Sequence, residues 1–283
     1  MKQTLRIMGL CALVALATAS CQKNEEKPTN ILTAELNQPT CGDKTYIGTN
    51  YDLLWSEGDQ IIVGDATFAS HIFTATSSGT THTTFTGNDA IDPNIANWAF
   101  YPINYVTSID PDNELITFTV PATQTYVEGS FATNTYPMVA RNGGNGTAFT
   151  FQGLFGVLAI PLTGNCTIGS VEFTDAAVNI CGETSVNPQR IVGSSKSSFT
   201  ITNLAKDNAN TITLNCEGGL TLTSTPKVIM FTLRPLACYG GFTITVKDLY
   251  GDVIYTRSAA PNINNTIRPE KIILMPTLNI PNP

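Results

Sequence analysis

The chain has 283 residues, a formal net charge of −7 and only 13% charged residues. Helix formers are rare compared with threonine, serine, asparagine, glycine and β-branched residues. This composition favours an exported all-β protein. The acidic balance argues against nucleic-acid binding, which needs a basic surface.

The first 20 residues have the three regions of a bacterial export signal. Lys2 and Arg6 give a positive start, residues 7–17 are apolar but too short to span a bilayer, and residues 18–20 are small. Cys21 follows directly, and the arrangement resembles a bacterial lipobox, in which the cysteine is acylated and the leader removed. The alternative is an ordinary secretory peptide with a chance cysteine. We expect the mature chain to be anchored by lipid on Cys21.

A polar spacer over residues 21–30 comes next, and short strand-like runs follow it. Residues 22–30 (QKNEEKPTN) are charged or polar and should not pack. Alternation of apolar and polar residues predicts strands at residues 198–204, 211–215 and 242–247, while the apolar run 228–233 (VIMFTL) predicts a strand buried on both faces. Residues 250–252 (YGD) predict a hairpin turn.

Two signals place a domain boundary near residue 142. Residues 142–146 (NGGNG) are a flexible break. Residues 45–140 hold ten acidic residues and no Lys or Arg, whereas from residue 143 onward nine basic residues face eight acidic ones. We predict an N-terminal β-sandwich over residues 31–142 and a C-terminal β-sandwich over residues 143–283.

Five cysteines remain after Cys11, in the leader, and Cys21 are set aside. No C-x-x-C spacing occurs, so neither a zinc ribbon nor a redox motif is indicated. Small buried residues in strands are the main interpretation, and a disulfide in the oxidising exterior is the alternative. Because the number is odd, at least one thiol stays free or links two chains. These cysteines are Cys41, Cys166, Cys181, Cys216 and Cys238.

Residues suited to catalysis or metal binding are sparse. His71 and His82 lie in threonine-rich sequence without the three or four converging ligands of a metal site. The acidic run 110–114 (DPDNE) lacks the spacing of a calcium loop, and a proline-containing turn accounts for it. No G-x-S-x-G elbow is present, and residues 193–195 (GSS) have a loop context. We predict no catalytic, cofactor or metal site and no enzymatic activity.

The two tryptophans offer the remaining route to ligand binding, because exposed rings can stack on sugars. Trp55 lies in LLWSEGDQIIV and Trp98 in NWAFYP, both beside turns. These contexts predict core anchors more than a carbohydrate platform.

Several of these segments together resemble fimbrillins, the pilus subunits of anaerobic Gram-negative gut and oral bacteria. After the lipobox, the shared pattern includes W-x-x-G-D-x-I, then Phe-Thr-Gly, Ala-x-Tyr-Pro, P-A-x-Q-x-Y and M-V-A, followed late in the chain by Leu-Arg-Pro and GFTITVKD. The motifs are carried here by Trp55, Gly58, Asp59, Ile61, Phe85–Gly87, Ala99–Pro102, Pro121, Ala122, Gln124, Tyr126, Met138–Ala140, Leu233–Pro235 and residues 241–248.

The resemblance implies two tandem transthyretin-like β-sandwich domains and assembly by strand exchange. In this family a protease removes the first strand at the outer membrane, and a strand of the next subunit fills the exposed groove. Residues 30–36 (NILTAEL) would be the removable strand, with Ile31, Leu32, Ala34 and Leu36 as its apolar residues, and residues 271–275 (KIILM) a donor. Family processing follows an arginine, but no arginine lies between Cys21 and Arg141, so Lys44 is the candidate cleavage position.

These features lead to one main functional hypothesis and one alternative. The first is a structural subunit of a cell-surface fimbrium that supports adhesion, with other fimbrial subunits, the outer membrane and surface ligands of host or bacteria as partners. The alternative is a monomeric surface lipoprotein that binds a glycan or protein, with Trp55 or Trp98 as the residues to test. A β-sandwich hydrolase has no motif behind it.

Overall fold

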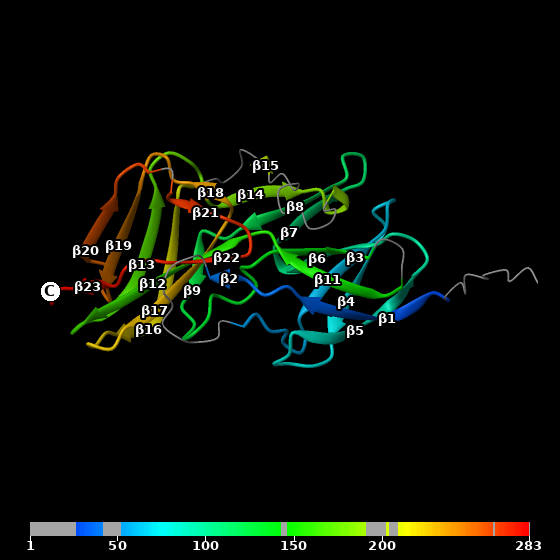
Figure 1. The fold of residues 1–283 in the computed structure, drawn as a ribbon, viewed down its shortest axis with the longest axis horizontal. Coiled ribbons are helices and arrows are strands. Elements are labelled where there is room, and N and C mark those ends of the chain that lie inside the picture. The colour runs from blue at the N-terminus through cyan, green and yellow to red at the C-terminus, as the bar shows by residue number, and fades with distance from the viewer. Residues whose placement is uncertain are drawn as a thin grey trace, which may run out of the picture.

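The structure is a computed structural model that describes residues 27–41, 52–142, 146–190, 202–203, 209–262 and 264–282. Within these residues the secondary structure consists of strands and two short 3-10 helices, η1 (Ile103–Tyr105) and η2 (Pro188–Arg190), with no α-helix. The predicted all-β class is therefore confirmed. Figure 1 shows an elongated molecule with one group of strands at each end and smaller sheets between them.

Seven strands close into a barrel at the end of the molecule that holds the N-terminal segment. Their hydrogen-bonded order is β1-β11-β10-β6-β3-β4-β5. Two separate sheets of a sandwich were expected, but β1 pairs with both β5 and β11 and so joins the two edges. The strands are β1 (Thr29–Leu36), β3 (Gln60–Gly64), β4 (Ser70–Ala75), β5 (His82–Ile91), β6 (Trp98–Tyr101), β10 (Met138–Arg141) and β11 (Ala148–Gly153).

Two five-stranded sheets form the opposite end, with Phe173 of one 6.3 Å from Phe231 of the other between ring centroids. The first sheet has the order β17-β12-β22-β2, with β23 also paired to β12, and the second has the order β20-β19-β13-β16-β9. The first contains β2 (Thr40–Cys41), β12 (Gly156–Gly164), β17 (Lys227–Leu233), β22 (Lys271–Leu274) and β23 (Leu278–Ile280). The second contains β9 (Thr123–Thr125), β13 (Thr167–Asp175), β16 (Thr211–Thr221), β19 (Phe242–Asp248) and β20 (Val253–Ala259).

Two smaller sheets complete the fold. One has the order β15-β14-β8-β7 and the other pairs β18 with β21. Their strands are β7 (Val106–Asp110), β8 (Leu115–Val120), β14 (Gly182–Val186), β15 (Thr202–Asn203), β18 (Leu236–Ala237) and β21 (Thr266–Ile267).

Strand pairing crosses the glycine-rich segment at residues 142–146. β1 pairs with β11, β2 with β22, β8 with β14, and β9 with β16, so the two predicted halves share hydrogen bonds in four sheets. The division at residues 142 and 143 and the transthyretin-like topology stay predictions.

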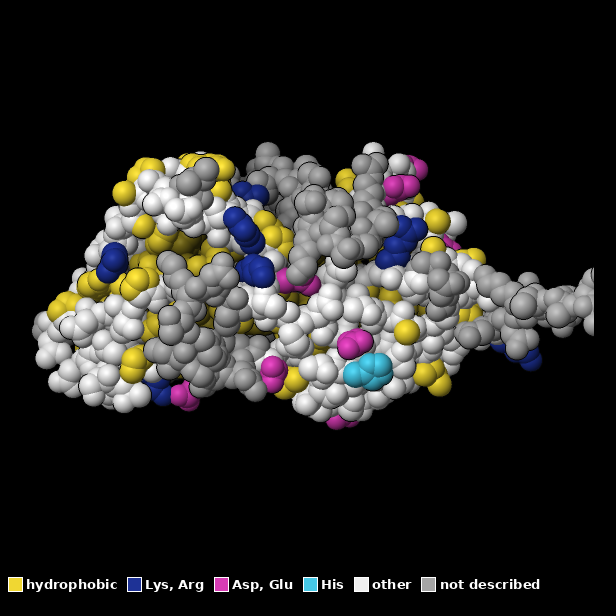
Figure 2. Space-filling view, viewed as in Figure 1, with side chains coloured by type: hydrophobic (Ala, Val, Ile, Leu, Met, Phe, Trp, Pro, Cys, Tyr) yellow, Lys and Arg dark blue, Asp and Glu magenta, His cyan; other side chains and the backbone are white. Residues whose placement is uncertain are grey.

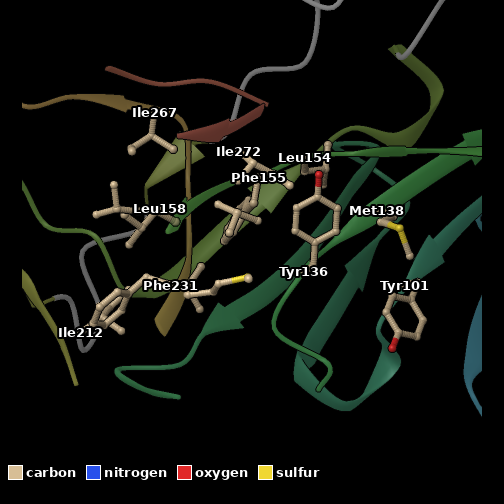
Figure 3. Close-up of a cluster of buried hydrophobic side chains, with 14 of the residues drawn as sticks. Tyr101, Tyr136, Met138, Leu154, Phe155, Leu158, Ile212, Phe231, Ile267 and Ile272 are labelled. Carbon is tan, nitrogen blue, oxygen red and sulfur yellow. The ribbon is translucent and has the colours of Figure 1, made fainter. Parts of the chain in front are cut away.

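A single hydrophobic cluster runs through both ends of the molecule. Figure 3 shows Tyr101 and Met138 on the barrel side, Leu158 and Phe231 on the sandwich side, and Phe155 between them. Apolar packing is therefore continuous from the barrel to the sandwich.

The strands at the C-terminal end have the alternation that the sequence predicts. In β19, Ile244 and Val246 are buried while Thr243 and Thr245 are less so, and β16 alternates in the same way from residue 211. β17 is buried along residues 229–233, as expected of a strand covered on both faces. Gly251, with φ of 89°, forms the predicted turn between β19 and β20. The predicted strand at residues 198–204 is described only at β15.

Candidate functional site

The predicted removable strand is a full member of the barrel. β1 runs antiparallel to β5, where Leu32 lies opposite Phe85, and parallel to β11, where Leu36 lies beside Phe151. Leu32, Ala34 and Leu36 are at most 4% exposed. Ile31, the fourth apolar residue of the strand, has a side chain that is 52% exposed, because the period of two that buries residue 32 turns residue 31 outward.

Both edges of β1 are hydrogen-bonded, and further bonds come from a side chain within the strand and from the residue after its C-terminal end. Asn30 Nδ2 donates to the carbonyl of Gly87 at 3.1 Å, and the amide of Asn37 donates to the carbonyl of Phe151 at 3.0 Å. Without β1, the barrel would be left with two unpaired edges and an apolar slot between β5 and β11. An exposed slot of this kind is a template for another strand.

The W-x-x-G-D-x-I segment builds the barrel core beside that strand. Trp55 is 1% exposed, and its ring meets those of Phe85, Tyr101 and Phe151 edge to face, at centroid distances of 5.0, 5.5 and 5.3 Å. Gly58 has a φ of 88°, a conformation that favours glycine, and starts the turn into β3. Trp55 therefore packs between the two strands that flank β1.

Asp59 is the acidic residue of this motif, and its carboxylate hydrogen-bonds to the turn and to Tyr101. One carboxylate oxygen accepts the amide of Ser56 at 2.8 Å. The hydroxyl of Tyr101 lies 2.9 Å from Asn134 Oδ1 and 3.3 Å from the other Asp59 oxygen. Burial raises the pKa of Asp59, while the bonds from Ser56 and Tyr101 oppose the shift. Burial also raises the pKa of Tyr101, and the charge of Asp59 adds to that effect.

The second tryptophan is also an internal anchor. Trp98 is 1% exposed, its indole Nε1 donates to the carbonyl of Asp65 at 2.7 Å, and its ring lies 5.2 Å from that of Phe68. A Cβ on Gly64 would approach the Trp98 ring to 2.3 Å, so the glycine makes room for the indole. The prediction that both tryptophans are core anchors is confirmed, and neither presents a face on which a sugar could stack.

Gln124, from the P-A-x-Q-x-Y segment, closes one end of the sandwich. Its side chain is 2% exposed and reaches from β9 across to β17. Its Nε2 donates to the carbonyl of Thr232 at 2.8 Å, and its Oε1 accepts the amide of Thr232 at 3.1 Å. One carboxamide thus replaces the pair of backbone bonds that a neighbouring strand would make. Sequence reasoning assigned no role to this residue, because its partner lies 108 positions away.

The other predicted strand for exchange, at residues 271–275, is paired within this chain. β22 lies parallel to β12 on one side and to β2 on the other. Ile272 is buried at 4% exposure, and the amide of Met275 donates to the carbonyl of Ala159 at 2.9 Å.

His71 and the acidic run at residues 110–114 contact polar groups close to them. His71 Nδ1 lies 3.2 Å from Asp89 Oδ2, and His82 is exposed on β5. No group of three metal-ligating side chains occurs in the part of the chain that the structure describes. Asp110 accepts the amides of Asp112 and Asn113 at 3.0 and 3.1 Å and the Asn113 side chain at 2.7 Å, the hydrogen bonding of a turn. The Asn113 bonds lower the pKa of Asp110.

Four of the five remaining cysteines carry free thiols. Cys181, Cys216 and Cys238 are buried, and Cys166 is half-buried. Burial raises the pKa of Cys216 to about 11, and burial together with the adjacent Asp175 carboxyl raises that of Cys238 to about 12. The interpretation as small buried residues is confirmed for three of them, although only Cys216 lies within a strand. The side chain of Cys41 lies outside the described part.

Several predicted features lie outside the described residues: the leader at residues 1–20, the lipidation position Cys21, the spacer as far as residue 26, the cleavage position Lys44, and residues 193–195. In the described part no helix is long and apolar enough to cross a membrane. On the face in Figure 2, most of the described surface is uncharged and the few charged side chains stand apart.

A seven-stranded barrel continuous with a two-sheet sandwich defines an all-β protein whose first strand is inserted between distant strands. Among solved structures, the chain resembles a candidate cell adhesion protein from Bacteroides ovatus, with a TM-score of 0.50, 12% identity, and coverage of 86% of this chain and 88% of that chain. At so low an identity, the structural likeness shows a shared fold alone. No protein-family model and no curated protein matches the chain.

Other solved structures on which the chain aligns are adhesion or fimbrial proteins. A candidate cell adhesion protein from Bacteroides uniformis aligns with a TM-score of 0.48, 16% identity, and coverage of 87% and 92% of the two chains. The tip fimbrial protein Mfa3 from Porphyromonas gingivalis, with a C-terminal truncation, aligns with a TM-score of 0.38, 12% identity, and coverage of 88% and 95%.

Proposed function

We propose that this protein is a structural subunit of a cell-surface fimbrium that supports adhesion and is assembled by exchange of its first strand. The observation that carries the proposal is the position of β1. Its three buried apolar side chains fill the barrel, both its edges are paired, and it lies within the N-terminal segment that a cut after Lys44 would release. A donated strand would satisfy the same backbone groups and apolar slot.

The N-terminal sequence supports a route to the surface for such a subunit. A lipid on Cys21 would hold the exported chain at the outer membrane while β1 keeps the slot filled. Cleavage after Lys44 would remove the lipid anchor and β1 together, because both precede that residue. The resemblance to fimbrillins and the fold shared with a candidate adhesion protein support the adhesive role.

The test is the N-terminus of the protein recovered from cells and from sheared surface filaments, determined by mass spectrometry. We expect an acylated Cys21 in the membrane fraction and a start near Thr45 in filaments. If filaments never contain the protein, even as a minor component, the proposal fails. If filament-associated protein keeps an acylated Cys21, processing at Lys44 is excluded and a permanently anchored subunit takes its place.

A further inference from the structure

The N-terminal segment continues beyond the barrel and makes a second set of contacts through Gln38. The Oε1 of Gln38 accepts the amide of Leu53 at 2.7 Å, and its Nε2 donates to the carbonyl of Leu53 at 2.9 Å. This is the arrangement of Gln124 on Thr232, where a carboxamide also takes both backbone groups of one residue. In each case a glutamine side chain makes the two hydrogen bonds that a residue of a neighbouring strand would make.

A third set of contacts follows two residues later, in another sheet. The amide of Thr40 donates to the carbonyl of Glu270 at 2.9 Å, Lys271 Nζ donates to Thr40 Oγ1 at 2.5 Å, and Thr40 pairs with Lys271 where β2 joins β22. One extended run, residues 29–41, is therefore bound in the barrel, at Leu53 and at the sandwich.

The site of Gln38 borders a hollow that the segment partly covers. Leu36, at the end of β1, lines a cavity of about 300 Å³ together with Leu53, Trp55, Phe131 and other residues. Without residues 29–41, the slot of β1 would merge with this cavity. The amide and carbonyl of Leu53, which is half-buried, would also lose the bonds that Gln38 makes.

From these contacts we infer that the track left by residues 29–41 selects its occupant by sequence, an inference that rests on the proposed function. The occupant is an extended strand of a different subunit, because residues 271–283 of a second copy of this chain contain no glutamine. It carries apolar residues at the three alternate positions of Leu32, Ala34 and Leu36, and a glutamine two residues after the last of them. The glutamine pairs with the backbone of Leu53.

The carboxamide of the glutamine helps to fix the register of the bound strand. The alternation of apolar and polar residues does not specify that register fully by itself. A slip of one residue would turn the apolar side chains outward, so the barrel already excludes it. A slip of two residues would keep two of the three apolar residues facing inward and would put Asn30 or Gln38 in the third position. It would also move the glutamine away from Leu53, since each residue advances a strand by about 3.3 Å. The bonds of the glutamine therefore add to the discrimination of the barrel against this slip.

The test uses the full chain with a specific protease site placed between residues 42 and 45, cleaved in solution. Labelled peptides of residues 29–41 compete with the released segment, and fluorescence anisotropy gives their dissociation constants. Gln38→Met keeps a similar length but removes both hydrogen bonds, and a second peptide has residues 38 and 40 exchanged. Glu35→Ala is the matched control, because Glu35 is exposed on β1.

We expect the unmodified peptide and the Glu35→Ala peptide to bind within about threefold of each other, since the Glu35 side chain faces solvent. The Gln38→Met and exchanged peptides should bind about 10-fold or more weakly, as expected for losing two hydrogen bonds. Equal binding of the Gln38→Met peptide would overturn selection by the carboxamide and leave strand exchange intact. If no peptide enters the cleaved protein, strand exchange itself fails.

Discussion

Trp55 combines the largest buried side chain with contacts to three separate strands. It touches aromatic rings of β5, β6 and β11, two of which flank β1. A residue in this position couples the turn before β3 to the slot for the first strand. Removal of the Trp55 side chain should therefore weaken packing throughout the barrel.

The first prediction concerns Trp55→Ala. Removing a fully buried indole should lower the free energy of unfolding by about 3–5 kcal/mol, because the lost contacts leave a cavity. The matched control is Leu54→Ala, since Leu54 is 45% exposed, and its effect should stay within about 0.5 kcal/mol. Urea unfolding followed by circular dichroism measures both. Equal effects of the two substitutions would contradict the placement of Trp55 in the core.

The second prediction concerns the pH dependence of stability and the thiol of Cys216. Its pKa in the folded protein is about 11, above the ordinary value of 9.0, so the folded state holds the proton more tightly than the unfolded state. The stabilising effect is complete below pH 9 and is lost as the pH rises from 9 through 11. At pH 10 we expect Cys216→Ala to reduce the loss of stability relative to pH 8 by about 1 kcal/mol.

Urea unfolding at pH 8 and pH 10 measures this difference. Cys166→Ala is the control, because Cys166 is less buried than Cys216 and should change the pH dependence less. An unchanged slope in Cys216→Ala would show that other groups cause the alkaline loss.

At the scale of the element, β1 shows how one strand divides its residues between core and solvent. Neighbouring positions have opposite environments: Leu32 is 0% exposed and Ile31 52%. The third prediction is that Leu32→Ala lowers the free energy of unfolding by about 2–5 kcal/mol, because a methyl group replaces a side chain in the closed core. Ile31→Ala should cost well under 1 kcal/mol, at about the level of a surface substitution.

The same two variants test the retention of β1 after cleavage between residues 42 and 45. Size-exclusion chromatography of the cleaved protein should separate the Leu32→Ala segment from the body more readily than the Ile31→Ala segment. Equal retention would mean that apolar burial does not hold the strand.

The sequence predicts single strands of this fold better than their partners. Alternation is local, so residues 211–215 and 242–247 and the apolar run 228–233 could be assigned from a few neighbouring residues. The partner of Leu36 is Phe151 and that of Gln124 is Thr232, more than 100 positions away, and no local period encodes such a pair. Closure of the barrel was therefore missed, because it depends on β1 pairing with two distant strands.

The candidate site was also predicted only in part from the sequence. The strand NILTAEL and its four apolar residues were implied by the resemblance to fimbrillins, but which of the four face the core was not predicted and Gln38 was not considered. The bonds of Gln38 to Leu53 join residues 15 positions apart, a pairing that composition and spacing do not reveal.

At the scale of the whole molecule, the continuous core predicts a single unfolding transition. Both tryptophans lie in the barrel, so their fluorescence reports that end, whereas Cys216 lies in the sandwich and its thiol reports the other. The fourth prediction is that fluorescence and thiol labelling give the same urea midpoint, as expected for two-state unfolding. Separate midpoints would show that the barrel and sandwich unfold independently.

The parallel pairing of β1 with β11 also sets an order of folding. The strand β1 finds its second neighbour only at residues 148–151, and β2 finds its neighbour only at residues 271–272. Hairpins such as β3–β4 and β19–β20 close far shorter loops, and short loops form sooner. We expect the slot to take shape before the strand that fills it is bound, so that the earliest segment of the chain is among the last to dock.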